Sequence, residues 1–377
     1  MTTPLDVRTI SADEHRDWIA SRPSVSFLQT PGWAAVKAEW RAESIGWFDG
    51  DRMVGAGLVL FRPVPKIERY LAYLPEGPDL DWTRIDLDAA LAPMVAHLKA
   101  AKAFAIRMGP PVVSRAWNAA AIKAGVADPV LGTLSDVPAD HSDAAALAVA
   151  DGLAARSWRP VPVEGGFSAG QPKYNFQVPL TDADGAPLTE DAVLKGMNQL
   201  WRRNIKKAAK LGVEVSLGGR DDLDDFHRVY VETAERDHFI PRPASYFTTM
   251  WDALNADEPD RMRLYLARHE GDLVAATTMV RVGQHAWYSY GASTTAKREV
   301  RGSNAVQWRM IADSLAAGAT VYDMRGITDT LDADDPHIGL IQFKVGTGGR
   351  AVEYLGEWDL PLNRALYKAF TLYLGRR

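Results

Sequence analysis

The sequence predicts a mixed α/β fold, of the α/β or α+β class, built from two domains. Short apolar stretches typical of strands alternate with amphipathic stretches typical of helices along the 377 residues. A helix is expected at 91–102, followed by a strand at 104–108, and the same order recurs with a helix at 305–316 and a strand at 320–324. A chain of this length exceeds the usual size of one hydrophobic core, so two domains are expected.

A weak internal repeat supports a duplicated architecture. Residues 50–60 and 271–280 both begin with a Gly-Asp pair that leads into small and β-branched residues, as in a β-hairpin. Each copy precedes a predicted helix and then another strand. A repeat of this length indicates a duplicated domain and not a solenoid, although Gly-Asp hairpins are also common without any duplication.

The boundary between the two domains is expected at 136–170, which is rich in Ala, Pro, Gly and Ser. Residues 174–180 then read as the first strand of the second half, and 362–374 as an amphipathic helix with basic residues at its end. Packing against the first domain explains this helix, and contact with a membrane surface is the alternative. The predicted domains are residues 1–150, completed by 350–377, and residues 155–349.

Composition excludes several classes of protein. The net charge of −5 argues against a protein that coats nucleic acid, although a local basic patch is compatible with it. Without cysteine there is no disulfide, thiol nucleophile or cysteine-ligated zinc. The first residues lack the pattern of a signal peptide, and the longest apolar runs are too short to span a bilayer. We therefore expect a cytoplasmic protein that touches a membrane, if at all, from its inner face.

Two motifs that suggest catalysis or metal binding have simpler explanations. Residues 166–170 match Gly-x-Ser-x-Gly, but they lie in a proline-rich loop without the strand-to-helix turn of a nucleophile elbow. The acidic residues from Asp332 to Asp335, with His337, lack the glycine and distal glutamate of a calcium loop. We expect both to be loops, and we expect no metal and no cofactor.

The turn at 299–304, before the helix at 305–316, lies where an acyl-CoA transferase has its phosphate-binding turn. An acyl-CoA transferase would place Gln/Arg-x-x-Gly-x-Gly/Ala there, with backbone amides facing the pyrophosphate. The chain has Glu299 and Asn304 at the two ends of that pattern, and a carboxylate at the first position repels phosphate. Binding of CoA is therefore disfavoured, although Arg298 and Arg301 flank the turn.

The densest basic helix is predicted at 197–212. Arg202 and Lys206 lie four residues apart on one face, as do Arg203 and Lys207. Such a stripe fits the phosphates of tRNA or the diphosphate of a precursor, while a solvated helix face is the alternative.

Several aromatic or glycine-rich segments occur in a fixed order at the edges of predicted strands and helices. They are 26–33, 71–79, 239–246, 287–293, 301–304, 322–327, 339–344 and 352–356. In type and order they resemble the Fem family, transferases that add amino acids from aminoacyl-tRNA to peptidoglycan precursors. The resemblance implies two tandem acetyltransferase-like domains (the GNAT type). The long helical arm of some members has no counterpart here, since 242–280 shows no sustained heptads.

The resemblance also assigns roles to residues that bind the precursor. Lys37 and Arg242 match positions that bind the nucleotide diphosphate of the cell-wall precursor. Tyr246 lies one helical turn beyond Arg242, so both can face one groove. Tyr290 matches an aromatic residue of the substrate channel, with a packed hairpin face as the alternative.

For the reaction itself, the resemblance points to Phe343 and Lys344, which match a pair near the reacting carbonyl and the tRNA terminus. We hypothesise that Lys344 stabilises the oxyanion or the leaving ribose hydroxyl. Similar enzymes often carry an aspartate where this chain has Gly109, so no general base is expected from that position. The amine then loses its proton to solvent or to a substrate phosphate.

The predicted function is transfer of an amino acid from aminoacyl-tRNA to an amine of the peptidoglycan stem peptide, on a UDP-linked muropeptide or a lipid-linked precursor. The ester is already activated, so positioning and electrostatic preorganisation suffice without a cofactor. Three alternatives remain: a tRNA-dependent transferase of natural-product biosynthesis, an acyl-CoA N-acyltransferase, and a non-catalytic binding protein. The sequence does not identify the amino acid, the tRNA or the oligomeric state.

Overall fold

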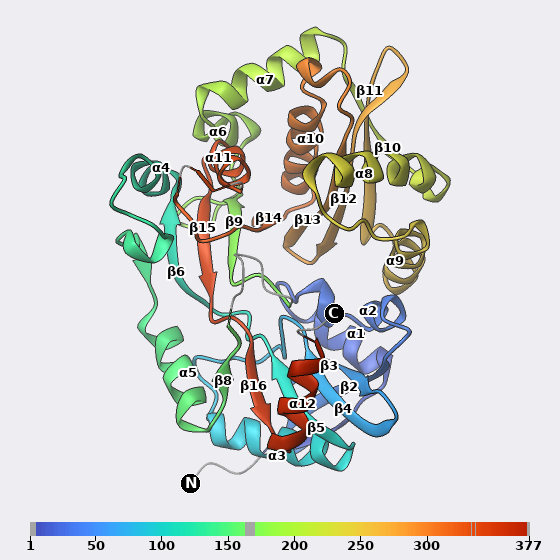
Figure 1. Cartoon of the computed structure of the whole chain (residues 1–377), viewed down its shortest axis with the longest axis vertical. Helices are drawn as coiled ribbons and strands as arrows, with labels where there is room; N and C mark the ends of the chain where they lie inside the picture. The colour runs from blue at the N-terminus through green and yellow to red at the C-terminus, as the bar shows by residue number, and fades with distance from the viewer. Residues whose placement is uncertain (1–4, 163–169, 333, 336, 375–377) are drawn as a thin grey trace. The chain divides into compact units, whose positions relative to one another are not determined.

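The computed structural model describes residues 5–162, 170–332, 334–335 and 337–374. The chain forms two compact units (Figure 1). The first unit contains the residues up to Ala116, the segment His141–Lys173 and the residues from Glu353 onward. The second contains Trp117–Asp140 and Tyr174–Val352. The last segment of the chain thus belongs to the first unit, while the domain limits drawn from the sequence stay predictions.

The first unit has a seven-stranded mixed sheet in which, among the described residues, β4 and β5 pair in parallel and the other neighbouring strands pair antiparallel. Its strand order is β1 (Asp6–Thr9), β2 (Arg41–Asp49), β3 (Arg52–Val64), β4 (Ile67–Leu74), β5 (Ala103–Met108), β16 (Trp358–Pro361) and β8 (Arg159–Pro160). Its helices are α1 (Ala12–Ala20), α2 (Pro31–Val36), α3 (Leu87–Ala100), α5 (Ala144–Ala155) and α12 (Arg364–Leu374), with a short 3-10 turn at Phe27–Gln29.

The second unit is built around the strands β10 (Glu214–Gly218), β11 (Met262–His269), β12 (Asp272–Val282), β13 (His285–Ser293), β14 (Val321–Gly326) and β9 (Tyr174–Pro179), in that order in the sheet. Its helices are α4 (Ala119–Ala127), α6 (Glu190–Gly196), α7 (Gln199–Lys210), α8 (Leu223–Asp237), α9 (Ala244–Asp257), α10 (Gly302–Ala316) and α11 (Ile338–Val345). Two strands, β6 (Val113–Asn118) and β15 (Arg350–Tyr354), run from one unit into the other, and β6 pairs with the short β7 (His141–Ser142).

The two units repeat one topology. In the first, β2, β3 and β4 are antiparallel neighbours, α3 follows, and β5 then pairs in parallel with β4. In the second, β11, β12 and β13 are antiparallel neighbours, α10 follows, and β14 pairs in parallel with β13. An antiparallel strand lies beyond the parallel pair in each case, β16 beside β5 and β9 beside β14. The duplication suggested by the sequence repeat therefore extends over most of both sheets.

Both Gly-Asp turns form hairpins as predicted. Gly50 adopts φ of 60° between β2 and β3, and Gly271 adopts φ of 86° between β11 and β12. Such positive φ values suit glycine, because an L side chain is strained there. These two hairpin turns are therefore encoded locally.

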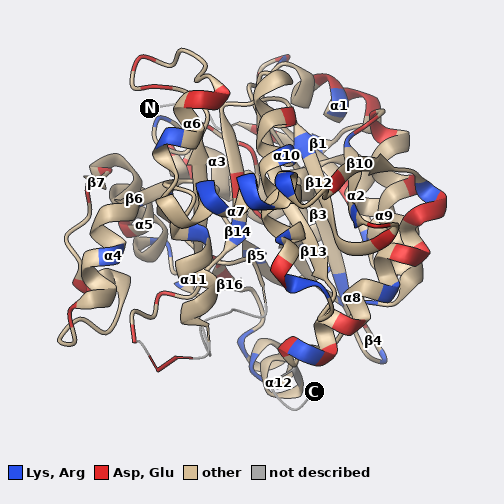
Figure 2. Ribbon diagram, turned by 90° about the horizontal axis from the view of Figure 1, so that it is seen from above, with Lys and Arg blue, Asp and Glu red and all other residues tan. Residues whose placement is uncertain are grey.

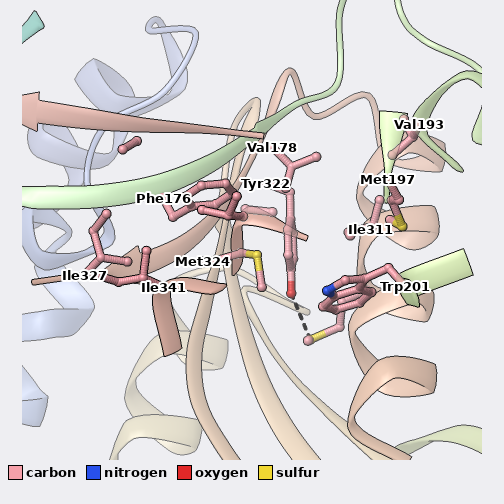
Figure 3. Close-up of a cluster of buried hydrophobic side chains, with 14 of the residues drawn as sticks. Phe176, Val178, Val193, Met197, Trp201, Ile311, Tyr322, Met324, Ile327 and Ile341 are labelled. Atoms are coloured by element: carbon pink, nitrogen blue, oxygen red, sulfur yellow. Dashed lines mark hydrogen bonds between the residues drawn. The ribbon is translucent and has the colours of Figure 1, made fainter. Parts of the chain in front are cut away.

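The sheet of the second unit is covered on both faces. Along β11, Leu264 and Leu266 pack with residues of α8 and α9, while Tyr265 and Ala267 belong to the cluster that also contains residues of α10. This alternation follows from the two-residue period of a strand, which sends successive side chains to opposite faces. Figure 3 shows part of the larger cluster, in which Tyr322 is fully buried. No helix of the described residues is long and apolar enough to cross a membrane.

The strand alternation gives a matched pair of leucines for testing the core. Leu264 on β11 is fully buried, whereas Leu217 on the neighbouring β10 is 51% exposed. We expect Leu264→Ala to lower the free energy of unfolding by about 2–5 kcal/mol, because it loses buried apolar contacts and leaves a cavity. Leu217→Ala should cost less than about 1 kcal/mol. Urea titration followed by circular dichroism measures both, and equal losses would contradict the assigned core.

Candidate active site

A cavity of about 370 Å³ lies in the second unit, where α7, α10 and α11 meet the open end of the β12–β13 hairpin. Polar and basic side chains predominate in its lining, and a few apolar side chains lie among them. The lining residues are Asn198, Leu200, Trp201, Asn204, Val274, Ser293, Thr294, Lys297, Arg298, Arg301, Gly302, Ser303, Asn304, Gly339, Gln342 and Phe343. A site of this composition suits a ligand that is partly anionic and partly apolar.

The N-terminus of α10 forms the basic side of this cavity. Arg301 precedes the helix in the left-handed conformation, with φ of 65°, and it makes no side-chain capping bond. The first amides of α10 thus remain available as donors, and the helix dipole favours an anion there. Gly302 is required at this point, because a Cβ would lie 2.8 Å from Val274 on β12. Arg298 and Arg301 have no carboxylate partner among the described residues, whereas Lys297 pairs with Glu270 and Asp272.

Phe343 on α11 and Trp201 on α7 form the aromatic side. Their ring centroids are 4.7 Å apart, and the Trp201 indole N–H donates to the Phe343 carbonyl oxygen over 2.8 Å. Asn198 begins α7 by accepting a hydrogen bond from the Trp201 amide. Gly346 allows this close approach, since a Cβ there would lie 2.2 Å from the indole. Phe343, predicted from the sequence, is therefore held at the cavity by a partner that the sequence did not reveal.

Lys344 is placed differently from its neighbour. Its Nζ donates to the carbonyl oxygens of Met324 and Gly326, each at 2.7 Å, and to that of Arg325 at 3.3 Å. The side chain is 3% exposed, and burial lowers the pKa of Lys344 to about 7. Three carbonyls match the three N–H donors of an ammonium. This geometry binds α11 to the end of β14, and the catalytic role suggested for Lys344 stays a prediction.

Asp323 reinforces the same turn from inside the sheet. It is fully buried and accepts hydrogen bonds from the Arg325 amide at 2.6 Å and from the Gln177 side chain at 3.2 Å. His285 stacks on Trp287, and its Nε2 lies 3.3 Å from Asp323 Oδ2, the oxygen that Gln177 also contacts. Burial raises the pKa of Asp323, but the bonds and charges of His285 and Arg325 outweigh it and hold the pKa below its usual value. These contacts fix the backbone of Met324 and of Arg325, which has a φ of 62°.

Arg242, Tyr246 and Tyr290 come together at the start of α9, and their role in binding the precursor stays a prediction. The Arg242 guanidinium lies 5.3 Å from the centroid of the Tyr246 ring, and the Tyr290 hydroxyl donates to the Tyr246 hydroxyl over 3.1 Å. Burial, together with the nearby Tyr290, raises the pKa of Tyr246 well above its usual range. The two tyrosines are neutral hydrogen-bonding groups beside a cation, which fits a polar, anionic ligand.

A model of the FemAB family matches residues 10–269 and 258–374. The chain belongs to the FemAB family. Lipid II:glycine glycyltransferase of Staphylococcus saprophyticus subsp. saprophyticus is 24% identical over 97% of this chain and 95% of that protein. The enzyme of the same name from Staphylococcus aureus is 24% identical over 95% and 93%. The crystal structure of FemX is similar in fold, with a TM-score of 0.79 at 23% identity over 97% of this chain and 99% of that one.

Membership of the FemAB family confirms the resemblance drawn from the ordered segments, and the FemX likeness confirms the expected mixed α/β fold with tandem acetyltransferase-like units.

Lys37 lies in the first unit as the residue that ends α2, with its Nζ 5.8 Å from the centroid of the Trp33 ring. Arg242 lies in the second unit. Gly109 follows β5 and offers no side chain, although a Cβ there would meet its neighbours only at ordinary contact distance, 3.5 Å or more.

The predicted basic helix of this FemAB family member is α7. Trp201 and Ala208 are buried, while Arg203, Lys206 and Lys207 are exposed and Arg202 is half-buried. Figure 2 shows lysine and arginine along α7. The outward face is therefore basic, as the spacing of four predicts, and its use for tRNA stays a prediction.

The remaining motifs add no further site. Within the described residues no group of His, Asp and Glu could hold a metal ion. His337 bonds to Asp335 of its own loop, with 3.0 Å between Nδ1 and Oδ1. The Gly-x-Ser-x-Gly match lies outside the described residues, except for Gly170.

Sequence reasoning missed Trp201 and Asp323, which position Phe343 and Lys344. Trp201 stood inside the basic stripe as its one large aromatic residue, which was a usable signal. Asp323 gave no such signal in the sequence, because its partners His285 and Gln177 are 38 and 146 residues away.

The buried amine of Lys344 predicts a dependence of stability on pH. Its pKa is about 7 in the fold and near the ordinary 10.5 when unfolded, so between these values the unfolded chain binds the extra proton. We therefore compare the free energy of unfolding of wild type with that of Lys344→Met. The value for wild type minus that for the variant should rise between pH 7 and about 10, by up to about 1.4 kcal/mol per pH unit. Urea titrations at pH 7, 8 and 9 measure this difference.

Lys210→Met, at the exposed end of α7, is the matched control and should show a difference that does not change with pH. If the difference in the free energy of unfolding between wild type and Lys344→Met also stays constant with pH, Lys344 keeps its proton in the folded protein, held by the three carbonyl oxygens.

Proposed function

We propose that this protein is an aminoacyltransferase that moves an amino acid from aminoacyl-tRNA to an amine of the stem peptide of a lipid-linked peptidoglycan precursor, and so builds the interpeptide bridge. Membership of the FemAB family and the near full-length match to lipid II:glycine glycyltransferases support the reaction class. The observation that carries the proposal is the cavity of the second unit, in which the N-terminus of α10 lies opposite Phe343.

The cavity has the features that the 3′ end of a charged tRNA requires. Terminal phosphates fit the free amides of α10 together with Arg298 and Arg301. The flat rings of Phe343 and Trp201 suit a nucleobase or the ester group. The exposed cations of α7, which also contributes to the cavity wall, continue the basic surface that the acceptor stem needs.

The chemistry is an aminolysis. A neutral amine attacks the ester carbonyl, a C–N bond forms, and the bond to the ribose oxygen breaks as that oxygen takes a proton. The ester is more reactive than the amide product, so the main task is to align the two groups. Lys344 supports this alignment by anchoring α11, and with it Phe343, to the turn after β14. Direct stabilisation of the oxyanion by Lys344 would require its Nζ to leave these carbonyls.

For the precursor, we propose that Arg242 binds the diphosphate and that Tyr246 and Tyr290 contact the attached sugar and peptide. The Arg242–Tyr246–Tyr290 cluster supports this role through its charge and its neutral hydroxyls. The phosphate-binding role of Lys37, in the first unit, stays a prediction from the resemblance. A lipid-linked acceptor requires that the protein work at a membrane surface, on the cytoplasmic side where charged tRNA is found. A UDP-linked acceptor would not need that contact.

One competing function has an observation in its favour. The uncapped N-terminus of α10 could also receive the pyrophosphate of an acyl-CoA, as the related fold allows. Glu299, exposed in the turn before α10, opposes this function because it adds negative charge beside the phosphates.

Mass spectrometry decides between these functions. The protein is incubated with lipid-linked and, separately, UDP-linked muropeptide pentapeptide, together with a mixture of charged tRNAs. We expect the lipid-linked acceptor to gain the mass of one amino-acid residue, and RNase to abolish the gain. An acetyl gain with acetyl-CoA and no gain with charged tRNA would overturn the proposal.

The role of the α10 turn yields a kinetic prediction. The double variant Arg298→Gln, Arg301→Gln should raise the KM for aminoacyl-tRNA about tenfold or more and change kcat less, because two phosphate contacts are lost. The slope of log affinity against log salt should shrink by about 1.4. Arg309→Gln, on the same helix but paired with Asp313, is the control and should leave the KM unchanged. Equal effects of the two changes would refute the phosphate site.

A further inference from the structure

A second cavity, of about 400 Å³, lies in the first unit between α12 and the strands β8 and β16. Arg159 of β8 and Pro361 of β16 form one wall, and residues of α12 form the other. The lining residues are Arg159, Pro361, Arg364, Tyr367, Lys368, Thr371 and Leu372. Cations and apolar side chains thus meet in one cavity, a composition that suits an anionic group attached to an apolar one.

The other side of α12 is packed against the sheet of the first unit (Figure 1). Phe370 is 5% exposed, and the centroid of its ring lies 5.2 Å from that of Phe104 on β5. Leu366 and Tyr367 pack against the same cluster, and the Tyr367 hydroxyl donates to Asp359 on β16 over 2.5 Å. The apolar face of α12 is therefore already used inside the unit, and these contacts fix the position of the side that lines the cavity.

The cavity side of α12 carries a row of exposed residues. Arg364, Lys368 and Leu372 follow one another at intervals of four and so share one side of the helix. All three are exposed, Leu372 at 57%, and all three line the cavity. One exposed leucine needs no explanation by itself, but here it continues a row of two cations.

The three cations of this cavity, Arg159, Arg364 and Lys368, have no carboxylate partner among the described residues. Asp359 is the register partner of Arg159 in the β8–β16 pair. Its carboxylate is instead bound by Arg107, through two 2.7 Å hydrogen bonds, and by the hydroxyl from α12. Arg364 is also the first residue of α12, where the helix dipole disfavours a cation. Neither ion pairing nor helix stability explains these charges, so they are available to an anionic ligand.

We propose that this cavity binds the phosphate of an anionic phospholipid, and that the first unit docks on a membrane through this side of α12. Arg159, Arg364 and Lys368 supply the charge that a lipid phosphate requires. Leu372 and Pro361 supply an apolar surface for the glycerol and the first methylenes of an acyl chain.

A phospholipid fits this lining better than a soluble anion or a nucleic acid does. A free phosphate uses the cations but leaves Leu372 in water. Single-stranded nucleic acid binds through exposed ring faces, whereas the aromatic residue that lines this cavity, Tyr367, is half-buried and bonded to Asp359.

The lipid site adds a surface to the proposed function without depending on it. A lipid-linked acceptor requires contact with a membrane, and only that link rests on the proposed function. The cavity beside α12 belongs to the first unit, whereas the cavity assigned to aminoacyl-tRNA belongs to the second. Binding of lipid can therefore be measured without tRNA or precursor.

Co-sedimentation of the full-length protein with vesicles tests the site. We expect binding to vesicles of phosphatidylglycerol and phosphatidylcholine in equal parts, and about tenfold weaker binding to phosphatidylcholine alone. The double variant Arg364→Gln, Lys368→Gln should weaken binding to the phosphatidylglycerol vesicles about tenfold or more, because two cations at the anionic surface are lost. The contacts that hold α12 on the sheet are kept in this variant.

A control with the same change of charge is Lys99→Gln, Lys123→Gln, which removes two exposed lysines from α3 and α4. It should weaken binding to the phosphatidylglycerol vesicles less than about threefold, because salt screens charges far from the lipid. Equal losses in the two double variants, or equal binding of wild type to both kinds of vesicle, would overturn the proposal. Wild type that binds inorganic phosphate but no vesicles would assign the cavity to a soluble anion and overturn it as well.

A fluorescent label locates the surface directly and does not require the double variant to fold. The chain has no cysteine, so a single introduced cysteine can be labelled selectively. With an environment-sensitive dye on Leu372→Cys, phosphatidylglycerol vesicles should move the emission to shorter wavelength, because the dye enters the headgroup region. Leu217→Cys, from a leucine that is 51% exposed on β10, is the control and should show no such shift. Bound vesicles without a shift at position 372 would contradict docking through α12.

A transfer assay separates this inference from the proposed function. We expect the double variant Arg364→Gln, Lys368→Gln to raise the KM for precursor embedded in phosphatidylglycerol vesicles about fivefold or more, and to leave the KM for detergent-dispersed precursor unchanged. Wild type that binds the vesicles without transferring an amino acid would refute the proposed function and support the lipid site. Transfer by a wild type that does not bind the vesicles would overturn the lipid site alone.

Discussion

The contacts of the Lys344 Nζ with three backbone carbonyl oxygens are the interaction on which the cavity of the second unit depends. They join α11 to the end of β14, where Arg325 adopts a left-handed conformation that few side chains favour. Asp323 holds the same turn from the sheet side. Since Phe343 immediately precedes Lys344 on α11, this one anchor also decides where the aromatic wall of the cavity lies.

The repeated topology explains why the cavity forms at that place. In each unit a helix connects an antiparallel strand to a parallel partner, as α10 does between β13 and β14. The N-terminus of such a helix lies at the end of the preceding strand, where free amides and glycine permit close approach of a ligand. The second unit adds Arg298 and Arg301 there, so an architectural feature becomes a site for an anion.

The cations of the molecule differ in whether the fold supplies them with partners. In the second unit, Arg298 and Arg301 lie without carboxylate partners among the described residues beside the N-terminus of α10, whereas in the first unit Arg115 and Lys173 are both paired with Glu353. Cations without a partner in the fold are available to an anionic ligand, and such groups are therefore more informative about ligands than paired ones. Glu353, which has two cations of its own, has a structural role.

By itself, the sequence determined the mixed α/β class, the duplicated hairpins at Gly50 and Gly271, and the basic face of α7, because each depends on neighbours within a few residues. The order of its motifs also identified the family, while the role of Phe343 stays a prediction. Tertiary structure alone decided that Lys344 bonds to carbonyls 18 to 20 residues away and that Tyr73 meets Glu357, 284 residues later. Partners this distant leave no periodic signal, since the fold and not the local chain brings them together.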